Sequence, residues 1–128
     1  MQGRLLAVVL GAALARGAAA APAHSLTVTA TAYNALPEQT DGNPNLGAWG
    51  DRLDRLKPGV RAIAVSRDLL DKGLVHGKHA RIKGLKGEFV VLDKMPPQWT
   101  RRIDIFMGRD ERGARRWGVR RVKLTWND

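Results

Sequence analysis

The chain has 128 residues, enough for one domain, and it contains no cysteine. The absence of cysteine excludes disulfides, thiol chemistry and cysteine-ligated metal sites. Lysine and arginine number 22 against 12 aspartate and glutamate residues, a formal net charge of +10 that predicts attraction to a polyanion.

The amino-terminal stretch has the outline of a secretory signal peptide. A short basic start precedes an apolar run over 5–15, and small-x-small cleavage signals follow at 18–20 and 21–23. The apolar run is shorter than the roughly 20 residues that span a bilayer. We therefore predict a leader over 1–23, a mature domain over 24–128 and a periplasmic or secreted location. An uncleaved helical anchor is the alternative.

Loss of the leader removes Arg4 and Arg16 and leaves 20 basic and 12 acidic residues, a net charge of +8. For an exported protein, we expect this charge to attract an anionic cell-wall surface. Nucleic acid is not expected as a partner, because the aromatic-interleaved basic motifs of nucleic-acid binders are absent. A merely well-solvated surface is the alternative.

Strand patterns dominate the mature part. Residues 25–33 alternate apolar and polar side chains, which predicts a half-buried strand. Residues 34–59 are rich in glycine, proline and asparagine, which is typical of a long ordered loop that serves a site. Further short strands are predicted over 61–65, 79–83, 89–92, 102–106 and 119–126.

Two short helices are predicted between these strands. Ser66 has the character of an N-cap for a helix over 67–72. Asp110 is expected to cap a second helix that runs to Trp117 and stops at Gly118. Six short strands with turn-rich connections indicate a mainly β fold closed into a small barrel, since closure removes exposed strand edges.

Two apolar runs each hold or end in an aspartate. Asp93 stands where the run over 89–92 stops, and Asp104 lies eleven positions later within the run over 103–106. A hairpin-like return would bring both carboxylates to one place, and an unpaired buried aspartate is costly. We therefore predict that both are kept for chemistry. The alternative is that they form ion pairs with neighbouring basic side chains, which are Lys94, Arg101 and Arg102.

Several motifs in the mature chain resemble those of the three-aspartate (3D) domain. They are Thr31-Ala32-Tyr33, Ile63-Ala64-Val65-Ser66, Leu92-Asp93-Lys94-Met95, the segment 102–108, and Trp117-Gly118 before a basic strand. That domain is a double-psi β-barrel found alone in secreted proteins and in the membrane-bound lytic transglycosylase A family. The resemblance implies a six-stranded double-psi barrel with one or two short helices. It also implies cleavage of the MurNAc–GlcNAc bond of peptidoglycan without hydrolysis.

The resemblance also assigns roles to individual aspartates. One carboxyl group protonates the glycosidic oxygen and then, as carboxylate, helps the sugar's own 6-hydroxyl attack C1, which leaves an anhydro end. We expect Asp93 to be this acid and base and Asp104 to be its partner, because the two match the family's first and second motifs. The third family aspartate is replaced by Ser66, and Asp41 or Asp68 is the candidate substitute that binds substrate.

Aromatic residues complete the expected site. Tyr33, Trp49 and Trp99 are candidate substrate-binding residues, because exposed aromatic faces stack on sugar rings, and packing is the alternative role for each. His76 and His79 lack a third ligand at useful spacing, so no metal is expected, and no cofactor. The expected partner is the peptidoglycan glycan strand, bound by a monomer. A non-catalytic glycan-binding barrel module is the alternative function.

Overall fold

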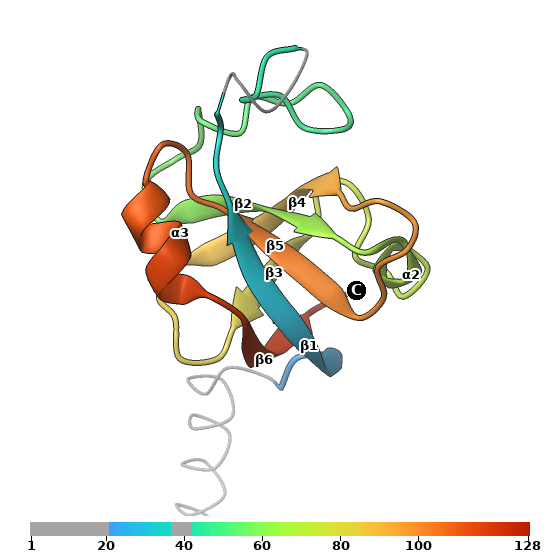
Figure 1. The fold of residues 1–128 in the computed structure, drawn as a ribbon. Coiled ribbons are helices and arrows are strands. Elements are labelled where there is room, and N and C mark those ends of the chain that lie inside the picture. The colour runs from blue at the N-terminus through green and yellow to red at the C-terminus, as the bar shows by residue number, and fades with distance from the viewer. Residues whose placement is uncertain (1–20, 37–41) are drawn as a thin grey trace, which may run out of the picture.

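A computed structural model describes residues 21–36 and 42–128, which form a closed six-stranded barrel with two short helices (Figure 1). Helix α2 (Arg67–Leu70) follows the second strand, and α3 (Glu111–Trp117) precedes the last. The strands are β1 (His24–Tyr33), β2 (Val60–Val65), β3 (His79–Ile82), β4 (Glu88–Lys94), β5 (Arg102–Phe106) and β6 (Arg120–Trp126). The predicted mainly β barrel is confirmed. Most of the predicted leader lies outside the described residues.

The order of strands around the barrel is β1-β5-β2-β4-β3-β6. The pairs β1–β5 and β2–β4 are parallel, and the other four pairs are antiparallel. Strand β2 therefore lies between β4 and β5, the two strands that carry Asp93 and Asp104. The predicted hairpin-like return between these two strands is wrong, because the chain crosses over an intervening strand.

In the described residues, no helix is long and apolar enough to cross a membrane.

The barrel interior is filled by alternate side chains of every strand. The largest contributions come from Val28, Ile63, Val65, Ile82, Phe89, Val91, Ile103, Ile105, Leu124 and Trp126. Because successive side chains of a strand point to opposite faces, the residues between these positions face outward. A second apolar cluster covers part of the outer face and includes Ala35 and Leu53 from the long loop. The loop therefore packs against the outside of the barrel.

A β-bulge in β4 sets the direction of Asp93. The pairing of β2 with β4 shifts in register, so that Ile63 opposes Val91 whereas Ala64 opposes Asp93 and leaves Leu92 unpaired. Strict alternation would have directed Asp93 into the barrel with Val91. The extra residue instead places Asp93 outside, and β4 continues to Lys94 rather than stopping before Asp93.

The helix ends agree with the sequence at α3 and differ at α2. Asp110 accepts a hydrogen bond from the Gly113 amide at 2.8 Å, and Gly118 ends α3 with a φ of 65°. Helix α2 stops earlier than predicted, and the Ser66 side chain does not cap it. The Ser66 hydroxyl oxygen instead accepts a hydrogen bond from the Arg102 amide at 3.0 Å, so it ties the start of β5 to the end of β2.

Candidate functional site

Sheet pairing brings the two aspartates into one row on the outer face of the barrel. Ala64 of β2 pairs with Asp104 of β5 on one side and with Asp93 of β4 on the other. Thr31 of β1 pairs in turn with Asp104. Neighbouring strands lie about 4.8 Å apart, so the two carboxylates flank a single small residue. We call Thr31, Asp104, Ala64 and Asp93 the aspartate row.

Asp104 occupies a half-buried position that favours its protonated form. Burial raises the pKa of Asp104; the Thr31 hydrogen bond and the Arg102 charge oppose this effect, and the Asp93 charge adds to it. The net result is a pKa above the ordinary value for aspartate. The Thr31 hydroxyl donates to Asp104 Oδ1 at 3.1 Å and fixes the orientation of the carboxyl group. Such a group is suited to holding a proton for transfer.

Asp93 has a different environment, in which its carboxylate accepts three hydrogen bonds. The Tyr33 hydroxyl donates to Oδ2 at 3.0 Å, and the backbone amides of Ala48 and Lys94 donate to Oδ1 at 2.9 and 3.0 Å. Asp93 thus joins β1 and the long loop to β4. Within the described residues, neither Asp93 nor Asp104 takes part in an ion pair. The alternative prediction, that these aspartates form ion pairs with Lys94, Arg101 or Arg102, is therefore not met.

Tyr33 reaches across the outer face from β1 to Asp93 on β4. Its ring packs edge-to-face on Phe106, with centroids 5.3 Å apart. Strand β2 presents Val60, Ala62 and Ala64 on this face, and the two small alanines leave room for the ring. Burial raises the pKa of Tyr33, and the charges of Asp93 and then Asp104 raise it further. The phenol therefore stays protonated as a donor, and both carboxylates act on one group.

The long loop is held on β4 by a close backbone approach. A Cβ atom at Gly47 would lie 2.0 Å from the Leu92 carbonyl oxygen, so only glycine allows this contact. The contact aligns the next amide, that of Ala48, with Asp93. The loop then carries Trp49 beside the aspartate row; Figure 1 shows the loop above the end of β1.

The two predicted tryptophans border the site on different sides. Trp49 stacks on His76 with centroids 4.8 Å apart, and 37% of its surface is exposed. Trp99 is 39% exposed, and the Arg102 guanidinium lies 4.3 Å from its ring centroid. Arg102 also acts electrostatically on Asp104, so Trp99 belongs to the neighbourhood of the row. Trp49 also has the Lys94 ammonium 5.6 Å from its ring centroid, and each tryptophan keeps part of its surface exposed.

Asp93 and Tyr33 also line a hollow of about 520 Å³ between the long loop and α3. Its other walls include Asn34, Leu36 and Pro44 from the loop and Glu111 and Arg115 from α3. This volume lies within the range of about 300–1,000 Å³ that is usual for small-molecule sites. The Asp93 end of the row therefore borders space that a ligand can enter.

The candidate substitutes for the third family aspartate are not part of the row. The Asp68 Oδ2 accepts a hydrogen bond from the Arg101 amide at 3.0 Å, at a residue whose φ of 47° is left-handed. Burial alone would raise the pKa of Asp68, but hydrogen bonds from Ser66 and the Arg101 amide outweigh burial and lower the pKa. Asp68 thus supports the turn into β5. Asp41 lies outside the described residues.

Thr31, Ala64 and Gly47 are site residues that sequence reasoning did not identify. The alternation over 25–33 did place Thr31 on the polar face of its strand, but the pairing that sets it beside Asp104 was not visible. Among residues 21–36 and 42–128, no group of three histidine, cysteine or acidic side chains is placed to hold a metal. His76 instead lies 2.6 Å from an Asp51 carboxylate oxygen.

Comparison with protein-family models and with curated proteins finds no match for the sequence. Among solved structures, the chain is similar to the Streptomyces papain inhibitor (SPI), with a TM-score of 0.51 and 17% identity. The match covers 84% of this chain and 97% of the inhibitor. A likeness at that identity shows a shared fold. The resemblance to the three-aspartate domain stays a prediction.

Burial of Asp104 predicts a pH-dependent contribution to stability. Because the pKa of Asp104 is higher in the folded protein than the ordinary 3.8, protonation of Asp104 adds to the free energy of unfolding. This addition is fully present below pH 3.8 and is lost as the pH rises through the folded-state pKa. Asp104→Asn removes the titrating group. In denaturant titrations between pH 4 and pH 7, we expect the variant's free energy of unfolding to rise relative to that of wild type. A constant difference would contradict the assigned burial effect.

Proposed function

We propose that this protein is a lytic transglycosylase-like enzyme that cleaves the MurNAc–GlcNAc bond of bacterial peptidoglycan. The observation that carries the proposal is the half-buried Asp104, whose pKa is raised, in one row with Asp93 and beside exposed aromatic rings. Acid-catalysed glycoside cleavage needs a carboxyl group of this kind. A net charge of +8 on the mature part supports action at an anionic wall outside the cytoplasm.

Asp104 is the proposed acid, which exchanges the roles expected from the sequence. Its proton passes to the glycosidic oxygen, the bond from that oxygen to C1 breaks, and GlcNAc leaves as an alcohol. The Asp104 carboxylate then takes the proton of the 6-hydroxyl group of MurNAc as that oxygen bonds to C1. No water is consumed, and Asp104 ends protonated as it began. The anhydro product therefore needs no activated water.

Asp93 is the proposed partner of the acid. Its charge helps to raise the pKa of Asp104. A carboxylate beside the reacting sugar would also stabilise positive charge at C1. Its three hydrogen bonds hold Tyr33 and the Trp49-bearing loop in place, so it also shapes the substrate face. Hydrogen bonding separates the functions of the two aspartates, since three donors already engage both oxygens of Asp93.

The test is product analysis after purified mature protein has been incubated with cell-wall sacculi. Transglycosylation should release anhydro-sugar fragments, which are one water lighter than the products of hydrolysis. Detection of hydrolysed fragments instead would indicate ordinary glycosidase chemistry and would contradict transglycosylation. Failure of the wild-type protein to solubilise any glycan would remove the enzymatic proposal.

A second candidate is inhibition of a papain-like cysteine protease. It is supported by the barrel shared with the Streptomyces papain inhibitor, which extends over most of both chains. The exposed Leu46 and Trp49 on the long loop would supply an apolar contact for a protease. Stoichiometric inhibition of papain, with no release of glycan fragments, would favour this function.

A further inference from the structure

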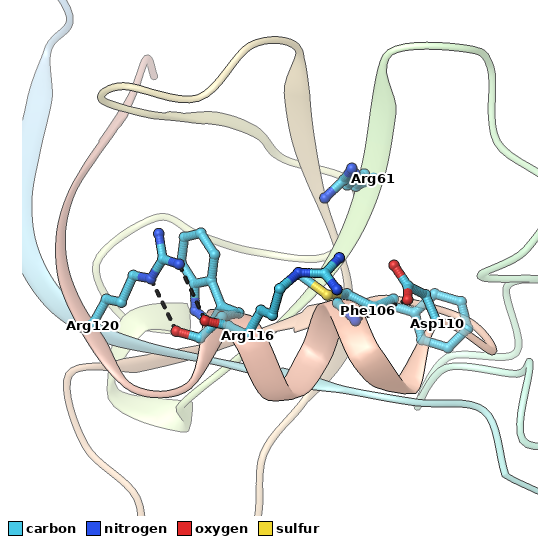
Figure 2. Close-up of a pocket in the computed structure, with 8 residues that line it drawn as sticks. Arg61, Phe106, Asp110, Arg116 and Arg120 are labelled. Carbon is cyan, nitrogen blue, oxygen red and sulfur yellow. Dashed lines mark hydrogen bonds between the residues drawn. The ribbon is translucent and has the colours of Figure 1, made fainter.

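A second hollow, separate from the aspartate row, is surrounded by three arginines from three different elements (Figure 2). Arg61 comes from β2, Arg116 from α3 and Arg120 from β6. Phe106 and Trp117 form its apolar wall, 7% and 8% exposed respectively. The hollow has a volume of about 440 Å³, which again lies in the range of small-molecule sites.

Arg120 is held in place before any ligand binds. Its Nε donates to the Trp117 carbonyl at 2.9 Å, and its Nη2 donates to the Arg116 carbonyl at 3.3 Å. The guanidinium carbon lies 4.1 Å from the Trp117 ring centroid. These contacts engage two of the five guanidinium N–H donors and leave the others available. Ligand binding therefore does not have to order this side chain, because it is already ordered in the free protein.

Arg61 and Arg116 have positive charges without a protein partner. In the part of the chain that the structure describes, neither side chain forms a hydrogen bond or an ion pair. The carboxylate that lines this hollow is that of Asp110, and its Oδ1 already accepts from the Gly113 amide. The hollow thus gathers three guanidinium groups against one carboxylate.

We propose that this hollow binds an oxyanion, either a carboxylate or a phosphate, carried by a ligand whose apolar part covers Phe106 and Trp117. Guanidinium groups bind both anions through paired, charge-assisted hydrogen bonds. A bare ion would occupy little of the hollow, and the aromatic wall provides a surface for the remainder of the ligand. The site uses none of the residues of the aspartate row.

The test is titration of the full mature protein with inorganic phosphate and, separately, with acetate at constant ionic strength, followed by amide chemical shifts. We expect saturable shifts around the hollow, and the anion that binds more tightly identifies the class. Arg61→Gln and Arg116→Gln should each weaken binding about tenfold or more. Arg121→Gln makes the same charge change at an exposed β6 residue that does not line the hollow, so it should retain the affinity.

Two outcomes would overturn the proposal. Absence of saturable shifts with either anion would exclude a site, and equal weakening by Arg121→Gln would indicate diffuse attraction to a basic surface. Asp104→Asn should leave anion binding unchanged, because Asp104 does not line the hollow. The anion site is therefore tested separately from the enzymatic proposal. Unchanged melting temperatures of the arginine variants serve as the control for folding.

Discussion

Replacing Asp104 with asparagine is expected to reduce the release of anhydro-sugar fragments from sacculi by about 10²–10⁴-fold. Asparagine keeps the size of the side chain, and its oxygen can still accept the hydrogen bond from Thr31. It cannot deliver a proton to the glycosidic oxygen or take one from the 6-hydroxyl group. The initial rate of fragment release, followed by mass analysis, measures the effect while circular dichroism reports on the fold.

Matched variants make this result specific. Asp71→Asn changes an exposed aspartate just after α2 and should retain the wild-type rate. Asp93→Asn is expected to lower activity in another way, since its amide nitrogen cannot accept the Tyr33 hydrogen bond. Loss of activity in Asp93→Asn with full activity in Asp104→Asn would restore the roles expected from the sequence.

The alternative of a non-catalytic binding module has its own signature in the same experiment. Wild type and Asp104→Asn would then both bind sacculi, and neither would release fragments. The row would in that case orient hydroxyl groups of the glycan without transferring a proton. Binding that is independent of Asp104, without product, would favour this function over catalysis.

Gly47→Ala is expected to reduce glycan cleavage by about 100-fold, because small displacements of positioning groups are that costly. The added methyl carbon would lie 2.0 Å from the Leu92 carbonyl oxygen, so the loop must move away from β4. This movement breaks the hydrogen bond from the Ala48 amide to Asp93 and shifts Trp49. Fragment release measures the loss, and hydrogen exchange of the Ala48 amide reports the displacement.

The barrel interior should tolerate this change, because Gly47 lies in the loop outside it. Gly42→Ala is the matched control: a methyl group there meets no atom of the described residues within 4 Å, and activity should stay near wild type. Retention of the wild-type rate in Gly47→Ala would mean that the loop has no part in the reaction. Equal losses in both variants would indicate a general sensitivity of the loop.

Local patterns in the sequence were sufficient to predict the elements of the barrel. Alternation over 25–33 marks β1, and the inward set that it predicts includes the buried Val28 and Ala30. The capping residues Asp110 and Gly118 bound α3 as predicted. These features depend on neighbours a few positions apart, so their physical causes are contained within the segment itself.

Pairing between distant segments decided the site. The sequence singled out Asp93 and Asp104 as chemically unusual, but it did not reveal that β2 lies between their strands with Ala64 opposite both. The bulge that directs Asp93 outward arises from register with β2 and has no signal in the run that precedes it. Tyr33 likewise joins the site only through the barrel's closure.

The sequence by itself therefore determined where the strands lie to within a few residues, which face of β1 is buried, and which acidic side chains interrupt apolar runs. Only the tertiary structure decided which carboxyl group has its pKa raised by burial and which one is occupied by hydrogen bonds. It also decided that Arg61 and Arg116 share a hollow. The physical reason is that burial and electrostatic coupling depend on long-range register, which local alternation leaves undetermined.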